Sequence, residues 1–270
     1  MSRLGGRGYL LPMSLPLIRE KFSSQSFFSP SDFIGYISAE GGLGNQPSPE
    51  AVILSYQRSL LDHVLSTRGT TRAEGYFSRE IRFIDSTQGR VAIAGRFGVG
   101  APAAGVMLEE LIAWGVRRFI SVGTAGSLRL ELPPGSLVLC VEALRDEGTS
   151  YHYAPGEVRA VPDEALTERL AEALAAQGLQ ASRAVTWTTD AIYRETALEV
   201  ARHRDAGAHV VEMEASALFT IAKFRGVALA ACFTVSDTLA ELSWRPEFHA
   251  ETTEEGLESL FAAALGSLSS

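Results

Sequence analysis

Cysteine is scarce in this sequence of 270 residues, and so are long apolar runs. Its two cysteines, Cys140 and Cys232, lie within apolar segments and lack both metal-site spacing and the numbers of a disulfide framework, so we expect buried thiols in a reducing compartment. No window approaches the roughly 18 apolar residues of a membrane helix, and Pro12 and Pro16 interrupt the apolar stretch near the N-terminus. We therefore predict a cytoplasmic protein with no membrane contact and no bound metal.

Positive charge is also scarce. Lysine and arginine together number 24 against 32 aspartates and glutamates, which gives a net charge of −8 and argues against binding to nucleic acid. Only Lys21 and Lys223 are lysines, and the other basic residues are arginines, whose planar guanidinium groups suit phosphate and carboxylate. An anionic ligand would therefore need a pocket in which a few arginines converge.

Hydrophobic residues make up 46% of the chain, enough for a large core. Loop-forming residues at 41–49 separate a partly irregular N-terminal extension, residues 1–49, from a single domain over 50–270. In that domain apolar strands alternate with amphipathic helices, and a polar turn joins two strands between 79 and 95 as a hairpin. The pattern predicts a single-domain α/β fold, a three-layer α/β/α sandwich with a central mixed sheet. Strands are expected at 51–55, 79–85, 90–95, 119–122, 137–143, 184–188, 210–211 and 227–235, and helices at 57–65, 102–114, 163–177, 195–204, 215–224 and the C-terminus.

Ligands of α/β sheets bind beyond the carboxyl ends of strands, so a ligand site is expected in the segments that follow strands. The first candidate is Gly98-Val99-Gly100 before a helix opened by Pro102, where free N–H groups and the helix dipole favour an anion. The spacing also fits a dinucleotide fingerprint, but the acidic residue expected after the next strand is missing. A tight turn without a ligand is the other interpretation.

The second candidate is Gly123-Thr124-Ala125-Gly126, directly after a buried strand. The hydroxyl of Thr124 can donate to a phosphate, while Gly123 and Gly126 leave room for a planar ring. Glycine-rich strand ends are common, so this motif is weak when taken alone.

The third candidate is Glu212-Met213-Glu214, where a strand passes into a helix. A carboxylate here can accept hydrogen bonds from two vicinal sugar hydroxyls, and the methionine can pack on the apolar side of the sugar. The alternative is a helix N-terminus whose acids interact with the helix dipole.

The fourth candidate is Asp237, which ends the apolar strand expected at 227–235. Partly apolar surroundings raise the pKa of a carboxyl group and let it act as a general acid near neutrality. An ordinary turn or N-cap aspartate is the alternative.

In this order, the four motifs, with Ser236 before Asp237, resemble the ordered signature of the trimeric-to-hexameric nucleoside phosphorylases, which include uridine phosphorylase and bacterial purine nucleoside phosphorylase. The resemblance extends over about residues 51–238. It implies cleavage of an N-ribosidic bond by inorganic phosphate, giving free base and ribose 1-phosphate. It further implies no cofactor besides that co-substrate, and a homo-oligomer built from dimers, up to a hexamer.

The resemblance also implies roles for individual residues. Glu214 binds the ribose hydroxyls beside Glu212, and Met213 packs on the ribose. Thr124, Gly126 and the Gly98 loop contact phosphate or substrate. Asp237 matches the acid that protonates a purine, which tilts the expected substrate from uridine towards purine nucleosides.

Two phosphate-binding positions depart from the family pattern. The usual Gly-Asp-Pro-x-Arg turn is Ser55-Tyr56-Gln57-Arg58 here, and the arginine before the Gly-Thr loop is Ser121. Arg58 and Arg96 are the arginines proposed to serve instead, with Arg79 as a further choice.

The base-stacking aromatic residue of the family is replaced by Ile192. Its neighbours Tyr193, Arg194 and Glu195 are therefore candidates for the base pocket. Two other functions stay open at this point: a nucleosidase that uses water, which would need a carboxylate soon after the first strand, and a nucleoside-binding protein without catalysis.

Overall fold

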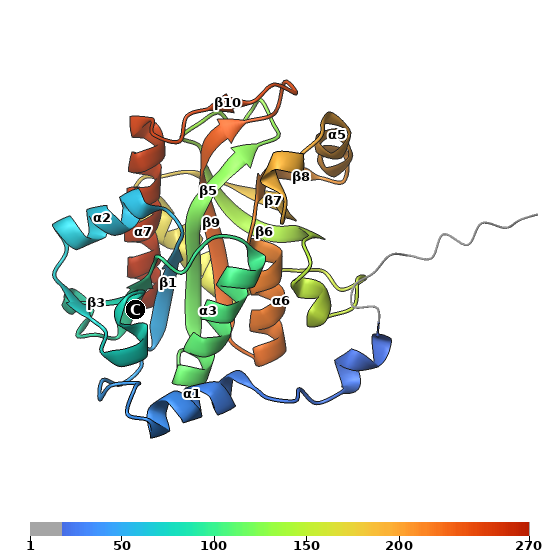
Figure 1. Ribbon diagram of the computed structural model, residues 1–270. Coiled ribbons are helices and arrows are strands. Elements are labelled where there is room, and N and C mark those ends of the chain that lie inside the picture. Colours follow the sequence, from blue (N-terminus) through green and yellow to red (C-terminus); the bar gives the residue numbers. More distant parts are fainter. Residues whose placement is uncertain (1–17, 270) are drawn as a thin grey trace, which may run out of the picture.

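The computed structural model describes residues 18–269 (Figure 1). Its strands are β1 (Ala51–Ser55), β2 (Thr70–Arg72), β3 (Ile81–Ile84), β4 (Val91–Ala94), β5 (Arg118–Ser127), β6 (Leu137–Asp146), β7 (Ala181–Thr189), β8 (Ala208–Glu212), β9 (Ala228–Thr238) and β10 (Arg245–Pro246). Its α-helices are α1 (Pro30–Ala39), α2 (Arg58–Thr67), α3 (Ala101–Trp114), α4 (Glu164–Ala176), α5 (Ala197–Asp205), α6 (Ala215–Arg225) and α7 (Glu251–Ser269).

All the described strands belong to one mixed sheet in the order β10-β9-β6-β7-β8-β5-β1-β4-β3-β2. Strand β1 lies between β4 and β5 and is parallel to both, whereas β2, β3 and β4 form antiparallel hairpins. Strand β9 also pairs in parallel with β5, so β5, β9, β6, β7 and β8 close on themselves. The predicted central mixed sheet is confirmed, and its closed half was not indicated by the sequence.

Helices cover both faces of the sheet. Successive residues of β1 point to opposite sides: Val52 and Leu54 join a core with α3 and α6, while Ile53 joins a core with α2, α4 and α7. Because both faces are buried, the strand is a continuous apolar run rather than an alternating one. The expected three-layer α/β/α arrangement is therefore confirmed.

Two strands run further than the sequence indicates. Strands β5 and β9 pair in parallel over their whole length, with Thr124 opposite Thr234 and Gly126 opposite Asp237 after a register shift. This continued ladder places Thr124, Gly126 and Asp237 inside strands, although the sequence analysis expected them in the segments after strands. They still lie at the carboxyl ends, where a ligand site was expected.

The N-terminal extension contains an ordered helix. Ser29 and Asp32 form a capping box at the start of α1, with Pro30 at the first helical position. Ile34 on this helix is buried in the same core as α3, and α1 lies along one end of α3 in Figure 1.

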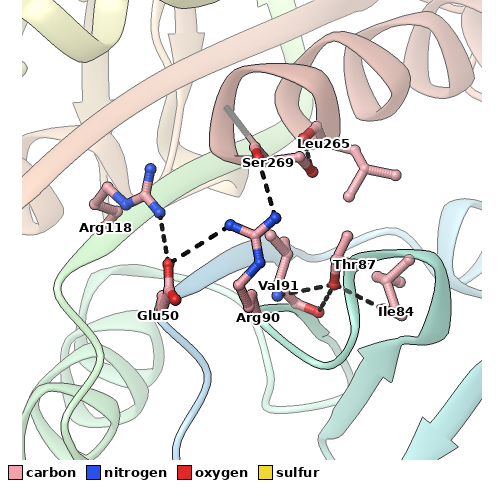
Figure 2. Close-up of polar contacts among 8 residues, drawn as sticks. All are labelled: Glu50, Ile84, Thr87, Arg90, Val91, Arg118, Leu265 and Ser269. Atoms are coloured by element: carbon pink, nitrogen blue, oxygen red, sulfur yellow. Dashed lines mark hydrogen bonds and ion pairs between the residues drawn. The ribbon is translucent and has the colours of Figure 1, made fainter.

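A cluster of charges lies at the amino ends of β1, β4 and β5, opposite the ends that carry the candidate motifs. Arg118 donates to the carboxylate of Glu50 at 3.2 Å, and Arg90 lies 4.0 Å from the same oxygen (Figure 2). Arg90 also donates to the carbonyl oxygen of Ser269 at 3.3 Å, which fixes the end of α7 against the sheet. These arginines therefore support the fold rather than a ligand.

Gly75 allows a close approach between the extension and the domain. Its φ is +57°, and a Cβ atom here would lie 2.1 Å from the carbonyl oxygen of Gly42. Gly178 has a similar φ of +74°, but its Cβ would meet nothing within 4 Å. We expect Gly178→Ala to lower the free energy of unfolding by about 1 kcal/mol through backbone strain alone, and Gly75→Ala by about 3 kcal/mol because the clash is added. Urea denaturation of both variants measures the difference; equal losses would show that the contact with Gly42 relaxes freely.

Candidate active site

The carboxyl ends of β5, β8 and β9 surround a cavity of about 470 Å³. The segment 239–250 that follows β9 covers it with Trp244 and Phe248, and the residues before α5 form its other edge. Much of its lining consists of residues singled out from the sequence: Tyr56, Gln57, Gly123, Thr124, Gly126, Ile192, Tyr193, Glu195, Glu212, Met213, Glu214 and Asp237. The four motifs, distant in the sequence, therefore meet in one site.

Glu214 connects two of these motifs. It is the residue immediately before α6, and its carboxylate accepts a hydrogen bond from the backbone N–H of Gly100. The φ of +90° at Gly100, which glycine tolerates, belongs to the turn that opens α3 and carries this N–H. Burial, with the nearby charge of Glu212, raises the pKa of Glu214 to about 8. Gly98 lies in the same turn but is exposed and outside the cavity lining.

Glu212 has its hydrogen-bonding capacity filled by the protein. One oxygen accepts from the hydroxyl of Thr188 at 2.6 Å, and the other accepts from the backbone N–H groups of Glu214 and Ala215 at 2.7 Å each. Burial raises the pKa of this carboxyl, while these donors oppose the increase. Glu212 therefore holds the turn from β8 into α6, and through it the backbone of Glu214.

Neutral side chains occupy the two phosphate-binding positions at which this sequence departs from the nucleoside phosphorylase pattern. The phenol of Tyr56 lies 3.1 Å from the hydroxyl of Ser121, and the amide of Gln57 donates to the hydroxyl of Thr124 at 3.0 Å. Burial and the charge of Glu214 raise the pKa of Tyr56 well above its usual range, so the phenol stays protonated. The side-chain oxygen of Gln57 is buried and has no partner within the described chain.

Asp237 is held by two donors. Its Oδ1 accepts from the hydroxyl of Ser236 at 2.9 Å, and its Oδ2 accepts from the indole N–H of Trp244 at 3.0 Å. Burial raises the pKa of this carboxyl, and both hydrogen bonds act in the opposite direction. Trp244 could not be predicted from the sequence, because it lies in a segment without a periodic pattern.

The segment before α5 contributes part of its predicted set. Ile192, Tyr193 and Glu195 line the cavity, whereas Arg194 is exposed and does not. Burial, followed by the charges of Asp237 and Glu199, raises the pKa of Glu195 to about 7. The structure therefore brings a second carboxyl group, besides Asp237, to this end of the cavity.

The arginines proposed for phosphate, Arg58 and Arg96, are not part of the cavity lining. Arg58 and Arg96 both contact Asp62 of α2, at 3.5 and 3.6 Å. Among the described residues that line the cavity there is no lysine, arginine or histidine, whereas four carry carboxyl groups. Arg79 is also absent from that lining.

The described residues, 18–269, contain neither a metal-binding cluster nor a membrane-spanning helix. No group of three or more His, Cys, Asp or Glu side chains is arranged to hold a metal ion. None of the helices in this part of the chain is both long enough and apolar enough to cross a membrane.

Comparison with known proteins gives a consistent result. A family model described as the phosphorylase superfamily matches residues 59–269. Guanosine phosphorylase of Halorubrum lacusprofundi is 36% identical over 143 residues, which are 53% of this chain and 59% of that protein. Uridine phosphorylase of Haemophilus influenzae is 28% identical over 180 residues, 62% of this chain and 68% of that protein. The chain therefore aligns with between about three fifths and two thirds of these two relatives.

Solved structures share the fold. Purine nucleoside phosphorylase of Toxoplasma gondii, in complex with immucillin-H, superposes with a TM-score of 0.70 at 20% identity, covering 82% of this chain and 91% of that one. AMP nucleosidase of Bacteroides thetaiotaomicron superposes with a TM-score of 0.69 at 20% identity, covering 87% and 96%. At this identity the likeness establishes the architecture alone.

Proposed function

Because the chain belongs to the phosphorylase superfamily, we propose that it is a nucleoside phosphorylase, an enzyme that cleaves the N-ribosidic bond with inorganic phosphate and releases free base and ribose 1-phosphate. The observation that carries the proposal is the cavity itself, in which Glu214 and Met213 lie with Thr124 and Asp237. Its volume of about 470 Å³ is in the range of small-molecule sites.

Glu214 is assigned to the ribose. The ring develops positive charge as the bond to the base breaks, so a carboxylate beside it stabilises the transition state. Gly100 holds one carboxylate oxygen, and the carboxylate can accept further hydrogen bonds from the vicinal hydroxyl groups. Those hydroxyls donate to the charged form and lower the pKa of Glu214 when substrate binds. Met213 offers an apolar surface next to this group.

Phosphate is assigned to the side of the cavity formed by Thr124 and Gln57. Thr124 accepts from Gln57, so its own hydroxyl proton is available to an anion. Arg58 and Arg96 would supply positive charge by leaving Asp62. Both ion pairs are solvent-exposed, and breaking such a pair costs less than about 1 kcal/mol.

The base is assigned to the end formed by Ile192, Tyr193, Glu195 and Asp237. Carboxyl groups there can exchange protons and hydrogen bonds with ring nitrogens, which favours a purine, with uridine as the second choice. We further propose a cytoplasmic homo-oligomer based on a dimer, which is supported by large apolar side chains exposed on α3 and α6, Val106 and Phe224.

The direct test is to incubate the purified protein with inosine, guanosine, adenosine and uridine, with and without phosphate, and to measure free base and sugar 1-phosphate. We expect release that depends on phosphate and is faster for purine nucleosides. Equal release without phosphate would indicate a nucleosidase. No release from any of the four would leave a nucleoside-binding protein as the explanation.

A further inference from the structure

Two carboxyl groups face the base end of the cavity, and they differ sharply in their partners. Both oxygens of Asp237 accept a hydrogen bond, one from Ser236 and one from Trp244. Glu195 also lines the cavity, but its carboxyl group has no hydrogen bond or ion pair with the described part of the chain. The protein therefore stabilises the charged form of Asp237 with two hydrogen bonds, whereas its described part provides no hydrogen-bond donor to Glu195.

This difference decides which of the two carboxyl groups holds a proton more firmly. Donors that point at a carboxylate favour its charged form, whereas partial burial without donors favours the neutral acid. The charged groups that act on Glu195 are Asp237 from β9 and Glu199 from α5, and both are negative. The other ionisable side chains of the lining that carry carboxyl groups are Glu212 and Glu214, so the described residues of the lining offer no positive charge to stabilise ionised Glu195. Two nearby carboxyl groups in such contrasting surroundings divide into one acid and one base.

We propose that Glu195, rather than Asp237, is the general acid that delivers a proton to the departing base; this inference rests on the proposed function. A phosphate oxygen forms a bond to C1′ while the bond from C1′ to the base nitrogen breaks, and that electron pair passes to the base. The Glu195 hydroxyl gives its proton to a ring nitrogen of the base and becomes a carboxylate. Glu195 is only partly buried, so water can return the proton before the next turnover.

Asp237 then acts as a positioning residue through its charge. Ser236 and Trp244 stabilise Asp237 as a carboxylate. Its negative charge disfavours ionisation of Glu195, so Glu195 stays protonated. Removing this charge should make Glu195 a stronger acid that loses its proton at lower pH. Glu195→Gln and Asp237→Asn are therefore expected to change the pH dependence in different ways.

The test compares kcat between pH 5 and 9 for guanosine and for 7-methylguanosine, whose base already carries positive charge and needs no proton. With guanosine, wild-type kcat should fall as the pH rises through about 7, where the raised pKa of Glu195 lies. Glu195→Gln should lower kcat for guanosine by about 100-fold or more and remove this fall. Its kcat for 7-methylguanosine should stay within a few-fold of wild type. Asp237→Asn should keep the fall but shift it to lower pH.

Glu172→Gln is the control, because Glu172 is an exposed acid on α4 that lies outside the cavity lining. It should leave kcat within a few-fold of wild type. The inference is overturned if Glu195→Gln keeps guanosine turnover and its pH dependence, or if Asp237→Asn alone abolishes that dependence.

A measurement without turnover separates this inference from the proposed function. In protein labelled with ¹³C at the glutamate carboxyl carbons, the signal missing from Glu195→Gln should titrate near 7 in the wild type. A midpoint near 4.5, the ordinary value, would overturn the inference even in an active enzyme. Wild-type protein that cleaves no nucleoside would overturn the proposed function, whatever this titration gives.

Discussion

Replacing Glu214 by alanine should lower kcat/KM for nucleoside cleavage by about 10²- to 10³-fold, the usual loss when a group that stabilises transition-state charge is removed. The truncation removes the carboxylate assigned to the ribose. It also leaves the backbone N–H of Gly100 without the acceptor that Glu214 provides. Steady-state kinetics with guanosine at saturating phosphate measures the effect.

Glu214→Gln separates the two contributions. Its amide oxygen can still accept from Gly100, so the loop before α3 should keep its position while the negative charge is lost. We expect most of the loss in turnover to persist in this variant, with little change in stability. Glu110→Gln, which alters an acid hydrogen-bonded to Tyr76 and outside this cavity, is the control. A decrease of only two- or three-fold in Glu214→Ala would exclude the assigned role.

Replacing Glu212 by alanine should destabilise the protein by about 3 kcal/mol, because several buried donors lose their acceptor at once. These donors are the hydroxyl of Thr188 and the backbone N–H groups of Glu214 and Ala215. Glu212→Gln should cost about 1 kcal/mol, because its oxygen can accept from the backbone while its amide faces hydroxyls that can also accept. Chemical denaturation of the two variants measures both values.

This experiment also decides between two roles for Glu212. From the resemblance, the sequence analysis placed this residue with Glu214 among the substrate contacts, whereas its hydrogen bonds suit a residue that holds the turn. A variant as stable as wild type, but with KM for nucleoside raised about tenfold, would favour direct contact with substrate.

Much of the architecture could be predicted because local pattern and final environment agree. Strand β1 is buried on both faces, so it reads as an unbroken apolar run. Gln88-Gly89 indicates the turn of the β3–β4 hairpin, and both residues adopt positive φ, +56° and +75°. The closure of β5 on β9 could not be predicted, because these strands lie about a hundred residues apart and no local pattern indicates that they pair.

The candidate site follows the same division. Thr124, Glu214 and Asp237 could be found because each lies at the carboxyl end of a strand. Two of its contacts could not be predicted. Gln57 reaches Thr124 across 67 residues, and Trp244, which reaches Asp237, lies in a segment with no repeating pattern. The ion pair between Arg96 and Asp62 could not be predicted, because Arg96 lies outside the helix of Asp62, whereas Arg58 and Asp62 have the i,i+4 spacing of a helix ion pair.

The two cysteines have a practical consequence for labelling. Cys140 and Cys232 are both fully buried, and burial raises the pKa of both thiols, so neither offers a reactive thiolate to maleimide reagents. The native chain therefore has a low labelling background without any cysteine being removed. A single cysteine introduced at the exposed position of Tyr193 would carry a fluorophore at the mouth of the cavity and report ligand entry directly.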